Sequence, residues 1–171
     1  MTMAQRIEPG PGQESVWNYP RPPRLVACSR SIEVIFNGIQ IVQTQRSMRV
    51  LETSHPPVYY IPPEDIAMHY FTQTSRSSFC EWKGLAGYYS LSVAGSGGDP
   101  APRQVENVAW FYPNPTPAFE PIRNYLALYA GPMDCCRVDG ETVQPQPGNF
   151  YGGWINSWIV GPFKQGPGQY I

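Results

Sequence analysis

Prolines and glycines interrupt this sequence too often for long helices to form. The 171 residues include 20 prolines and 16 glycines, and both residue types break helices and favour turns. Short β-branched and aromatic runs between them are typical of strands. One short helix is expected at Pro63, because Glu64 and Asp65 would lie in its first turn, where carboxylates favour the helix dipole. The sequence predicts a mainly β fold of roughly eight to ten strands with one or two short helices.

Two dipeptides predict tight β-hairpins. Asn37-Gly38 separates SIEVIF from IQIVQT, and Asp139-Gly140 separates CCRV from ETVQ. Both dipeptides suit the two positive-φ positions of a type I′ turn, which joins paired antiparallel strands. Further strands are expected in the segments 47–53, 57–61, 77–84, 86–95, 105–112 and 126–130.

The chain divides into a proline-rich arm and one domain. Residues 1–23 contain EPGPGQ and NYPRPPR, which favour an extended conformation. Trp17 and Tyr19 indicate that this arm packs back on the domain, because aromatic side chains are mostly buried. Residues 24–171 are expected to form a single β domain, with a glycine- and aromatic-rich C-terminal segment covering it. Within it, GSGGDPAPRQ, residues 95–104, is predicted to be a flexible loop.

Charge and hydropathy argue against two classes of partner. The formal net charge is −1 and 15% of residues are charged, whereas a nucleic-acid-binding domain carries surplus lysine and arginine for the phosphates. No apolar run reaches the ~18–20 residues that span a bilayer, and the N-terminus has no apolar signal core. We therefore expect a cytoplasmic protein with no nucleic acid and no membrane among its partners.

The cysteines and histidines give no metal signature. Cys28, Cys80, Cys135 and Cys136 include no C-x-x-C pair, which a structural zinc site would use. The two histidines also lack the spacing of a metal motif. Neither a P-loop, a dinucleotide-binding G-x-G-x-x-G nor a G-x-S-x-G nucleophile elbow occurs. We expect no metal and no cofactor.

The segment SFCEWKG brings reactive residue types together. Cys80, Glu81, Trp82 and Lys83 are consecutive. If they form a strand, Cys80 and Trp82 share one face, and Glu81 and Lys83 share the other. Cys80 is then either a small buried residue or a pocket thiolate, and the second role needs a nearby cation. Glu81 and Lys83 form a solvated pair, or else Lys83 is a candidate catalytic and ligand-binding residue.

A second group of polar residues occurs in RVLETSHPPVYY. Arg49 and Glu52 could orient a bound carboxylate or phosphate, or could form an ion pair within the domain. His55 has the intrinsic pKa of a general base, or is an inert loop histidine. Glu52 is a further catalytic candidate, and Tyr60 adds a hydroxyl for ligand selectivity.

The aromatic residues suggest the walls of a binding site. By strand alternation Trp110 and Tyr112 fall on one face, and Trp82 joins them if its strand is adjacent. Together with Tyr88 and Trp154 they form either hydrophobic core or a pocket for a flat or cationic small molecule.

These segments resemble a known family. RVLETSHPPVYYIPPED, CEWKGLAGYYS, VAWFYPNPTPAF and YGGWINSWIVGPFKQGPG together resemble the DUF427 family, a group of domains of unknown function, over roughly residues 20–168. The family pattern is C-x-x-K-G-x-A-x-Y followed by W-x-Y-x-x-P. The matching residues are Cys80, Lys83, Gly84, Ala86, Tyr88, Trp110, Tyr112 and Pro115.

The resemblance implies a fold and a site. It implies a β-tent (Mss4-like) architecture, in which two antiparallel sheets pack at an angle. Proteins similar to it in fold hold ligands on the inner sheet surface, which makes Trp82, Trp110 and Tyr112 pocket candidates. The zinc of many such proteins does not carry over, because the C-x-x-C pairs are missing. A nucleotidyltransferase-like role finds no support, because the carboxylates of a two-metal site are absent.

Three functions remain open. The first is a domain that binds an unidentified small molecule in an aromatic-walled pocket. The second is a protein-interaction module that uses the arm and the aromatic tail. The third is a thiol-dependent redox enzyme resembling methionine sulfoxide reductase B, with Cys80 as the nucleophile. The sequence leaves open whether the protein is an enzyme and what its oligomeric state is.

Overall fold

The computed structural model describes residues 5–95 and 102–170. The described residues form five hydrogen-bonded sheets, two with four strands, one with three and two with two. All strand pairs except one are antiparallel. The predicted fold class, mainly β with antiparallel sheets, is confirmed.

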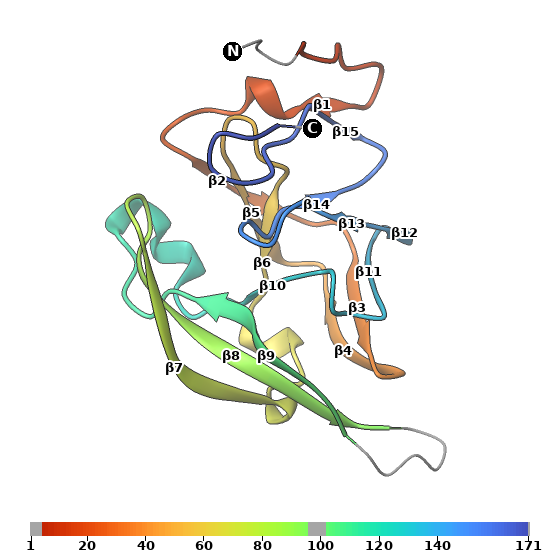
Figure 1. The fold of residues 1–171 in the computed structure, drawn as a ribbon, viewed down its shortest axis with the longest axis vertical. Helices are drawn as coiled ribbons and strands as arrows, with labels where there is room; N and C mark the ends of the chain where they lie inside the picture. The colour runs from red at the N-terminus through yellow and green to blue at the C-terminus, as the bar shows by residue number, and fades with distance from the viewer. Residues whose placement is uncertain (1–4, 96–101, 171) are drawn as a thin grey trace.

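The longest strands form one twisted sheet, in the order β10-β9-β8-β7. Its strands are β7 (Phe71–Cys80), β8 (Gly84–Ala94), β9 (Pro102–Phe111) and β10 (Ala127–Leu128). Figure 1 shows this sheet running obliquely past the shorter ones. Strand β9 begins inside the predicted loop 95–104, so the loop prediction is wrong for residues 102–104. Residues 96–101 of that loop lie outside the described residues.

Both predicted hairpins are confirmed. Asn37 (φ 49°) and Gly38 (φ 77°) join two paired strands, and Asp139 (φ 50°) and Gly140 (φ 81°) join two more. The strands are β3 (Ile32–Phe36), β4 (Ile39–Thr44), β11 (Cys135–Val138) and β12 (Glu141–Thr142). They form one sheet in the order β12-β11-β3-β4.

Three smaller sheets complete the fold. One contains β2 (Arg24–Cys28), β5 (Ser47–Leu51) and β6 (Val58–Tyr60). The two-stranded sheets pair β1 (Glu14–Ser15) with β15 (Ile159–Val160), and β13 (Gln144–Pro145) with β14 (Trp154–Ile155). Proline and glycine keep most of these strands short.

All helical segments among the described residues are 3-10 turns. They are η1 (Val16–Asn18), η2 (Pro63–Asp65), η3 (Met68–Tyr70) and η4 (Pro117–Ile122). The helix expected at Pro63 is therefore a single turn, with proline at its start and Glu64 and Asp65 inside it. No helix in this part of the chain is long and apolar enough to cross a membrane.

Strand alternation separates two apolar clusters on opposite faces of the long sheet. Tyr89 and Phe111 belong to the main core, whereas Tyr88 and Trp110, which pair across β8 and β9, belong to a second cluster. The neighbouring strand β6 shows the same division, because its Tyr60 joins the second cluster. The second cluster is the one that faces the candidate site.

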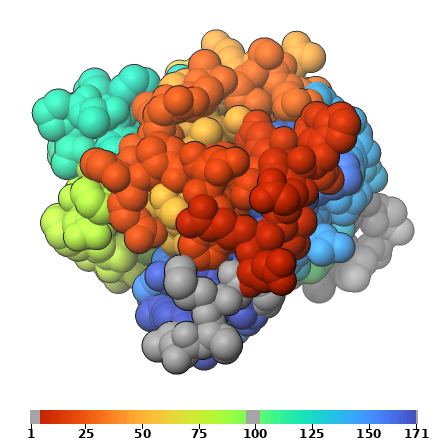
Figure 2. All heavy atoms as spheres, turned by 90° about the horizontal axis from the view of Figure 1, so that it is seen from above, coloured from red at the N-terminus to blue at the C-terminus, as the bar shows by residue number. Residues whose placement is uncertain are grey.

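The N-terminal arm packs on the C-terminal segment, as its aromatic residues predict. Strand β1 pairs in parallel with β15, Val16 is fully buried, and the Trp17 indole donates to the Pro162 carbonyl oxygen (2.9 Å). Figure 1 places β1 and β15 at the same end of the molecule. Figure 2 shows N-terminal residues, in red and orange, covering much of that end.

Candidate functional site

The segment Cys80–Lys83 does not continue as a strand. Strand β7 ends at Cys80, residues 81–83 form a turn, and Cys80 pairs with Gly84 at the start of β8. Gly84 has φ 105°, a conformation that other residues rarely adopt. Thr116 fixes this turn, since its hydroxyl donates to the Trp82 carbonyl oxygen (2.6 Å) and its amide to that of Lys83 (3.1 Å).

This turn corrects the predicted distribution of side chains. The prediction that Cys80 and Trp82 face one way, and Glu81 and Lys83 the other, is wrong, because alternation stops where the strand ends. All four residues line one cavity. The Lys83 side chain thus reaches the side of the sheet that holds Cys80.

The cavity has a volume of about 720 Å³ and is lined by several parts of the chain. Strands β7, β8 and β9 form one wall, and Val50, Val58 and Tyr60 from β5 and β6 form another. The loop that follows β5 and the turn at residues 81–83 form the ends. The C-terminal segment, through residues 146–152 and Lys164, closes the remaining side.

Aromatic side chains dominate the walls. The Trp110 indole donates to the Tyr60 hydroxyl (3.3 Å) and packs on Tyr129 with ring centroids 4.7 Å apart. The Tyr60 and Tyr112 rings lie 6.3 Å apart, and Tyr88 bonds to the Ser78 hydroxyl (2.8 Å). Burial raises the pKa of the Tyr60 hydroxyl, although Lys83 opposes the shift, so this hydroxyl is uncharged at neutral pH.

Lys83 is the most buried charge in the cavity wall, with 9% of its surface exposed. Its ammonium lies 5.6 Å from the centre of the Tyr112 ring and in contact with Cys80. Burial lowers the pKa of this ammonium, but electrostatic interactions with Tyr60, Cys80 and Glu52 and the hydrogen bond to the Cys80 sulfur outweigh burial, so that the pKa is raised overall. Lys83 therefore carries a positive charge at neutral pH.

His55 lines the cavity as a neutral side chain. Burial and the positive charges of Lys164, Arg21 and Lys83 lower its pKa to about 4, although the Glu52 carboxylate lies 3.7 Å from its Nε2 atom. The Gln146 amide nitrogen lies 3.3 Å from the Nδ1 atom, so Nδ1 is the acceptor in that contact. A histidine with this pKa is a weak general base.

Cys80 is a half-buried free thiol beside the Lys83 ammonium. Among the described residues that line the cavity it is the only cysteine. Cys28 and Cys136 belong to the main core instead, and burial raises the pKa of the Cys136 thiol.

Two predicted ligand-binding residues lie outside this cavity. Arg49 forms an ion pair with both carboxylate oxygens of Glu14 (3.1 and 3.2 Å), which binds the N-terminal arm to β5. The ion-pair alternative for Arg49 is the arrangement observed. Trp154 is 2% exposed in the main core, where its indole donates to the Leu128 carbonyl oxygen (3.1 Å). The cavity does bring together Glu52, His55, Tyr60, Cys80, Trp82, Lys83, Tyr88, Trp110 and Tyr112.

The sequence reasoning missed the wall formed by the C-terminal segment and Tyr129. Asn149, Phe150 and Tyr151 lie against the cavity, and the Tyr129 hydroxyl donates to the Phe150 carbonyl oxygen (3.3 Å). A Cβ atom on Gly152 would come within 2.2 Å of the Trp110 ring. The glycine therefore allows the backbone to lie directly on the indole, and the sequence YGG is the signal for this close approach.

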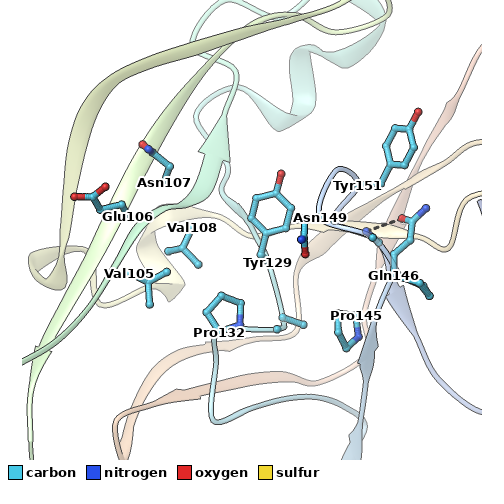
Figure 3. A pocket seen from close by; sticks show the side chains of 16 residues that line it. Val105, Glu106, Asn107, Val108, Tyr129, Pro132, Pro145, Gln146, Asn149 and Tyr151 are labelled. Carbon is cyan, nitrogen blue, oxygen red and sulfur yellow. Dashed lines mark hydrogen bonds between the residues drawn. The ribbon is translucent and has the colours of Figure 1, made fainter. Parts of the chain in front are cut away.

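A smaller cavity of about 380 Å³ lies on the other side of this wall. Figure 3 shows its lining side chains coming from two directions, with Val105 and Val108 from β9 and Gln146 and Asn149 from the segment after β13. The dashed line marks the bond from the Gly153 amide to the Gln146 side-chain oxygen (3.0 Å). Residues 146, 149, 151 and 152 line both cavities.

No group of three His, Cys, Asp or Glu side chains in the described part of the chain is arranged to hold a metal ion. The arrangement is instead a mainly β domain with an aromatic cavity and a buried lysine. The chain belongs to a family described as a domain of unknown function (DUF427), which matches residues 24–139. No curated protein matches the chain. The matched segment ends before Gln146, so the C-terminal wall of the cavity lies beyond it.

Proposed function

We propose that this domain binds a small molecule in the larger cavity. The volume of about 720 Å³ falls within the roughly 300–1,000 Å³ of small-molecule sites. Such sites combine apolar and aromatic walls with a few polar groups that orient the ligand. Trp82, Trp110 and Tyr112 supply the walls, and Glu52 and Lys83 supply charges.

One observation carries this proposal most directly. Tyr60, Tyr88, Trp110 and Tyr112 of the second apolar cluster line the cavity, whereas no described buried residue of the main core lines it. Trp110 is an example, because it contacts Tyr60 and Tyr129 but also lines the cavity. A filled hydrophobic core would leave no such space.

The proposal predicts ligand-dependent stabilisation that requires Trp82. A thermal-shift screen with nucleotides, amino acids, sulfoxides and aromatic acids is the measurement. A ligand at about 100 times its Kd adds about 2.7 kcal/mol to the free energy of unfolding. We expect such a ligand to lose its effect on Trp82→Ala, which shortens a half-buried side chain of the cavity. Trp17→Ala, which changes a tryptophan of the arm, should keep the effect.

Two results would count against cavity binding. One is a ligand that stabilises Trp82→Ala and Trp17→Ala equally, because its site would then lie elsewhere. The other is the absence of any stabilising ligand in all four chemical classes.

A second candidate function is thiol chemistry at Cys80, favoured by its contact with the Lys83 ammonium. In a reductase reaction the thiol would attack a sulfoxide and become a sulfenic acid, while the sulfoxide leaves as a thioether. Two external thiols would then restore Cys80, because the described cavity wall holds no second cysteine. The first would displace water from the sulfenic acid to form a mixed disulfide, and the second would release the Cys80 thiol and leave as the external disulfide.

Alkylation with iodoacetamide tests this candidate. If Cys80 is a catalytic thiol, it should react faster than free cysteine at neutral pH, and Lys83→Met should slow it, because a nearby cation favours the thiolate. Peptide mapping separates Cys80 from Cys135, a half-buried thiol outside the cavity. A Cys80 rate equal to that of free cysteine would rule this function out.

Two further expectations belong with this proposal. The four free cysteines are in keeping with a reducing cytoplasm, where disulfides are rare. The oblique arrangement of the long sheet against the shorter ones in Figure 1 is in keeping with a β-tent.

A further inference from the structure

The charges around the larger cavity are mostly positive. Among the described residues, four cationic side chains line it, and they face two carboxylates. The cationic residues are Arg21, Arg76, Lys83 and Lys164. The chain contains only these two lysines, and both line this one cavity, although the protein has a net charge of −1. A cationic ligand would meet repulsion here.

The two carboxylates leave this excess largely in place. Glu52 is already bound by Arg21 at 3.2 Å. Arg76 lies over the Tyr88 ring, 4.9 Å from its centre, and forms no ion pair with a described carboxylate. A ligand would therefore meet the positive charges without displacing a strong ion pair.

Lys83 is the most buried of these charges, and no carboxylate of the described residues comes within ion-pair distance of its ammonium. Its neighbours are the Cys80 sulfur and the rings of Tyr112 and Phe119, at 5.6 and 5.9 Å from the ring centres. A buried charge is costly unless it is paired. An anion in the cavity would supply the missing partner.

We propose that the ligand is a small aromatic anion, whose acidic group binds the Lys83 ammonium while its ring packs on Trp82 and Trp110. This inference rests on the proposed function. Of the flat or cationic ligands expected from the aromatic residues alone, it keeps the flat ligand and replaces the cation with an anion. A carboxylate, sulfonate or phosphate group would satisfy the site, because each accepts charge-assisted hydrogen bonds from an ammonium.

The protonation state of Lys83 supports recognition rather than covalent chemistry. A lysine that forms a Schiff base must be neutral, which requires a lowered pKa. The pKa of Lys83 is raised instead. A lysine that stays protonated suits ionic recognition of an anion better than covalent chemistry.

Two fluorescent dyes with the same rings test the inference. Anilinonaphthalene sulfonate carries a negative charge, and phenylnaphthylamine is its uncharged counterpart. Both should bind the protein, the sulfonate more tightly. Lys83→Met should weaken binding of the sulfonate dye about tenfold to a hundredfold, the loss expected for a charged hydrogen bond. The affinity for the neutral dye should stay unchanged. Lys164→Met is the matched control, with a smaller expected loss because this lysine is more exposed and screened by solvent.

Near-ultraviolet circular dichroism checks that each variant is folded. If Lys83→Met does not fold, Lys83→Gln and Lys83→Arg replace it. The arginine variant should keep the preference for the sulfonate, and the glutamine variant should lose it.

The possible outcomes separate this inference from the proposed function. Equal binding of the two dyes, or a sulfonate preference that survives in Lys83→Met, would overturn the anion inference and leave cavity binding in place. Failure of both dyes to bind the folded protein would contradict cavity binding itself, and the anion inference with it.

Discussion

His55 is an example of a residue whose surroundings change its chemistry. In the unfolded chain its pKa is near the ordinary 6.5, and in the folded protein it is about 4 because of burial and neighbouring cations. Between these values the unfolded state binds a proton that the folded state excludes. Stability contributed by His55 is therefore fully present above pH 6.5 and is lost as the pH falls toward 4.

The first prediction at this scale concerns acid sensitivity. The shift corresponds to about 3 kcal/mol of unfolding free energy, most of it lost between neutral pH and about pH 4.5. His55→Gln should remove this part of the loss, measured by urea unfolding at both pH values. His69→Gln changes the other histidine, which is exposed. The free energy of unfolding of this variant should fall with pH as that of the wild type does. A His55→Gln protein with the full wild-type loss would show that His55 is not responsible.

Single residues also show what strand alternation can and cannot predict. Trp110 and Tyr112 belong to the same apolar cluster at the end of β9, so a period of two was sufficient to group them. Lys83 was misplaced because it lies in a turn. Arg49 was placed in the site by its residue type, and its partner Glu14 is 35 positions away in the chain, a distance that no local pattern covers.

At the scale of elements, the turn between β7 and β8 decides where Lys83 lies. Gly84 holds a φ of 105°, and a Cβ atom there would lie 3.4 Å from the Asn114 carbonyl oxygen. The turn is thus fixed by a backbone conformation and by the bonds from Thr116, in addition to the pairing of Cys80 with Gly84. The glycine in C-x-x-K-G was the available signal that the strand ends.

This turn gives a prediction that separates strain from binding. Gly84→Ala should lower the free energy of unfolding by about 1–3 kcal/mol, because alanine is strained at this φ. It should also weaken binding of the sulfonate dye, because it displaces Lys83. Gly140→Ala is the matched control, with φ 81° and open space around the new methyl group. It should lose similar stability and bind the dye as the wild type does. Wild-type dye affinity in Gly84→Ala would contradict a role for the turn in positioning Lys83.

Elements differ in how much of them the sequence predicts. The two hairpins follow from dipeptides whose conformational preference is local, so they were predicted correctly. The C-terminal wall of the cavity depends on the contact between Gly152 and Trp110, which joins residues far apart in the chain. Glycine-rich and aromatic composition indicated that this segment is ordered, but it gave no position for Asn149 or Tyr151.

At the scale of the whole molecule, the cavity depends on packing between distant parts of the chain. The long sheet provides one wall and β5 and β6 another, while the C-terminal segment closes the side. The N-terminal arm in turn packs on that C-terminal segment through β1 and β15. The ion pair between Glu14 and Arg49 also binds the arm to β5. The region beyond the DUF427 match thus completes a site whose central residues lie within the match.

The most direct test of this account is a crystal structure of the protein with bound anilinonaphthalene sulfonate. We predict the naphthalene ring against Trp82 and Trp110, with a sulfonate oxygen about 3 Å from the Lys83 Nζ atom. A dye molecule bound elsewhere, or one in the cavity with its sulfonate turned away from Lys83, would contradict the account.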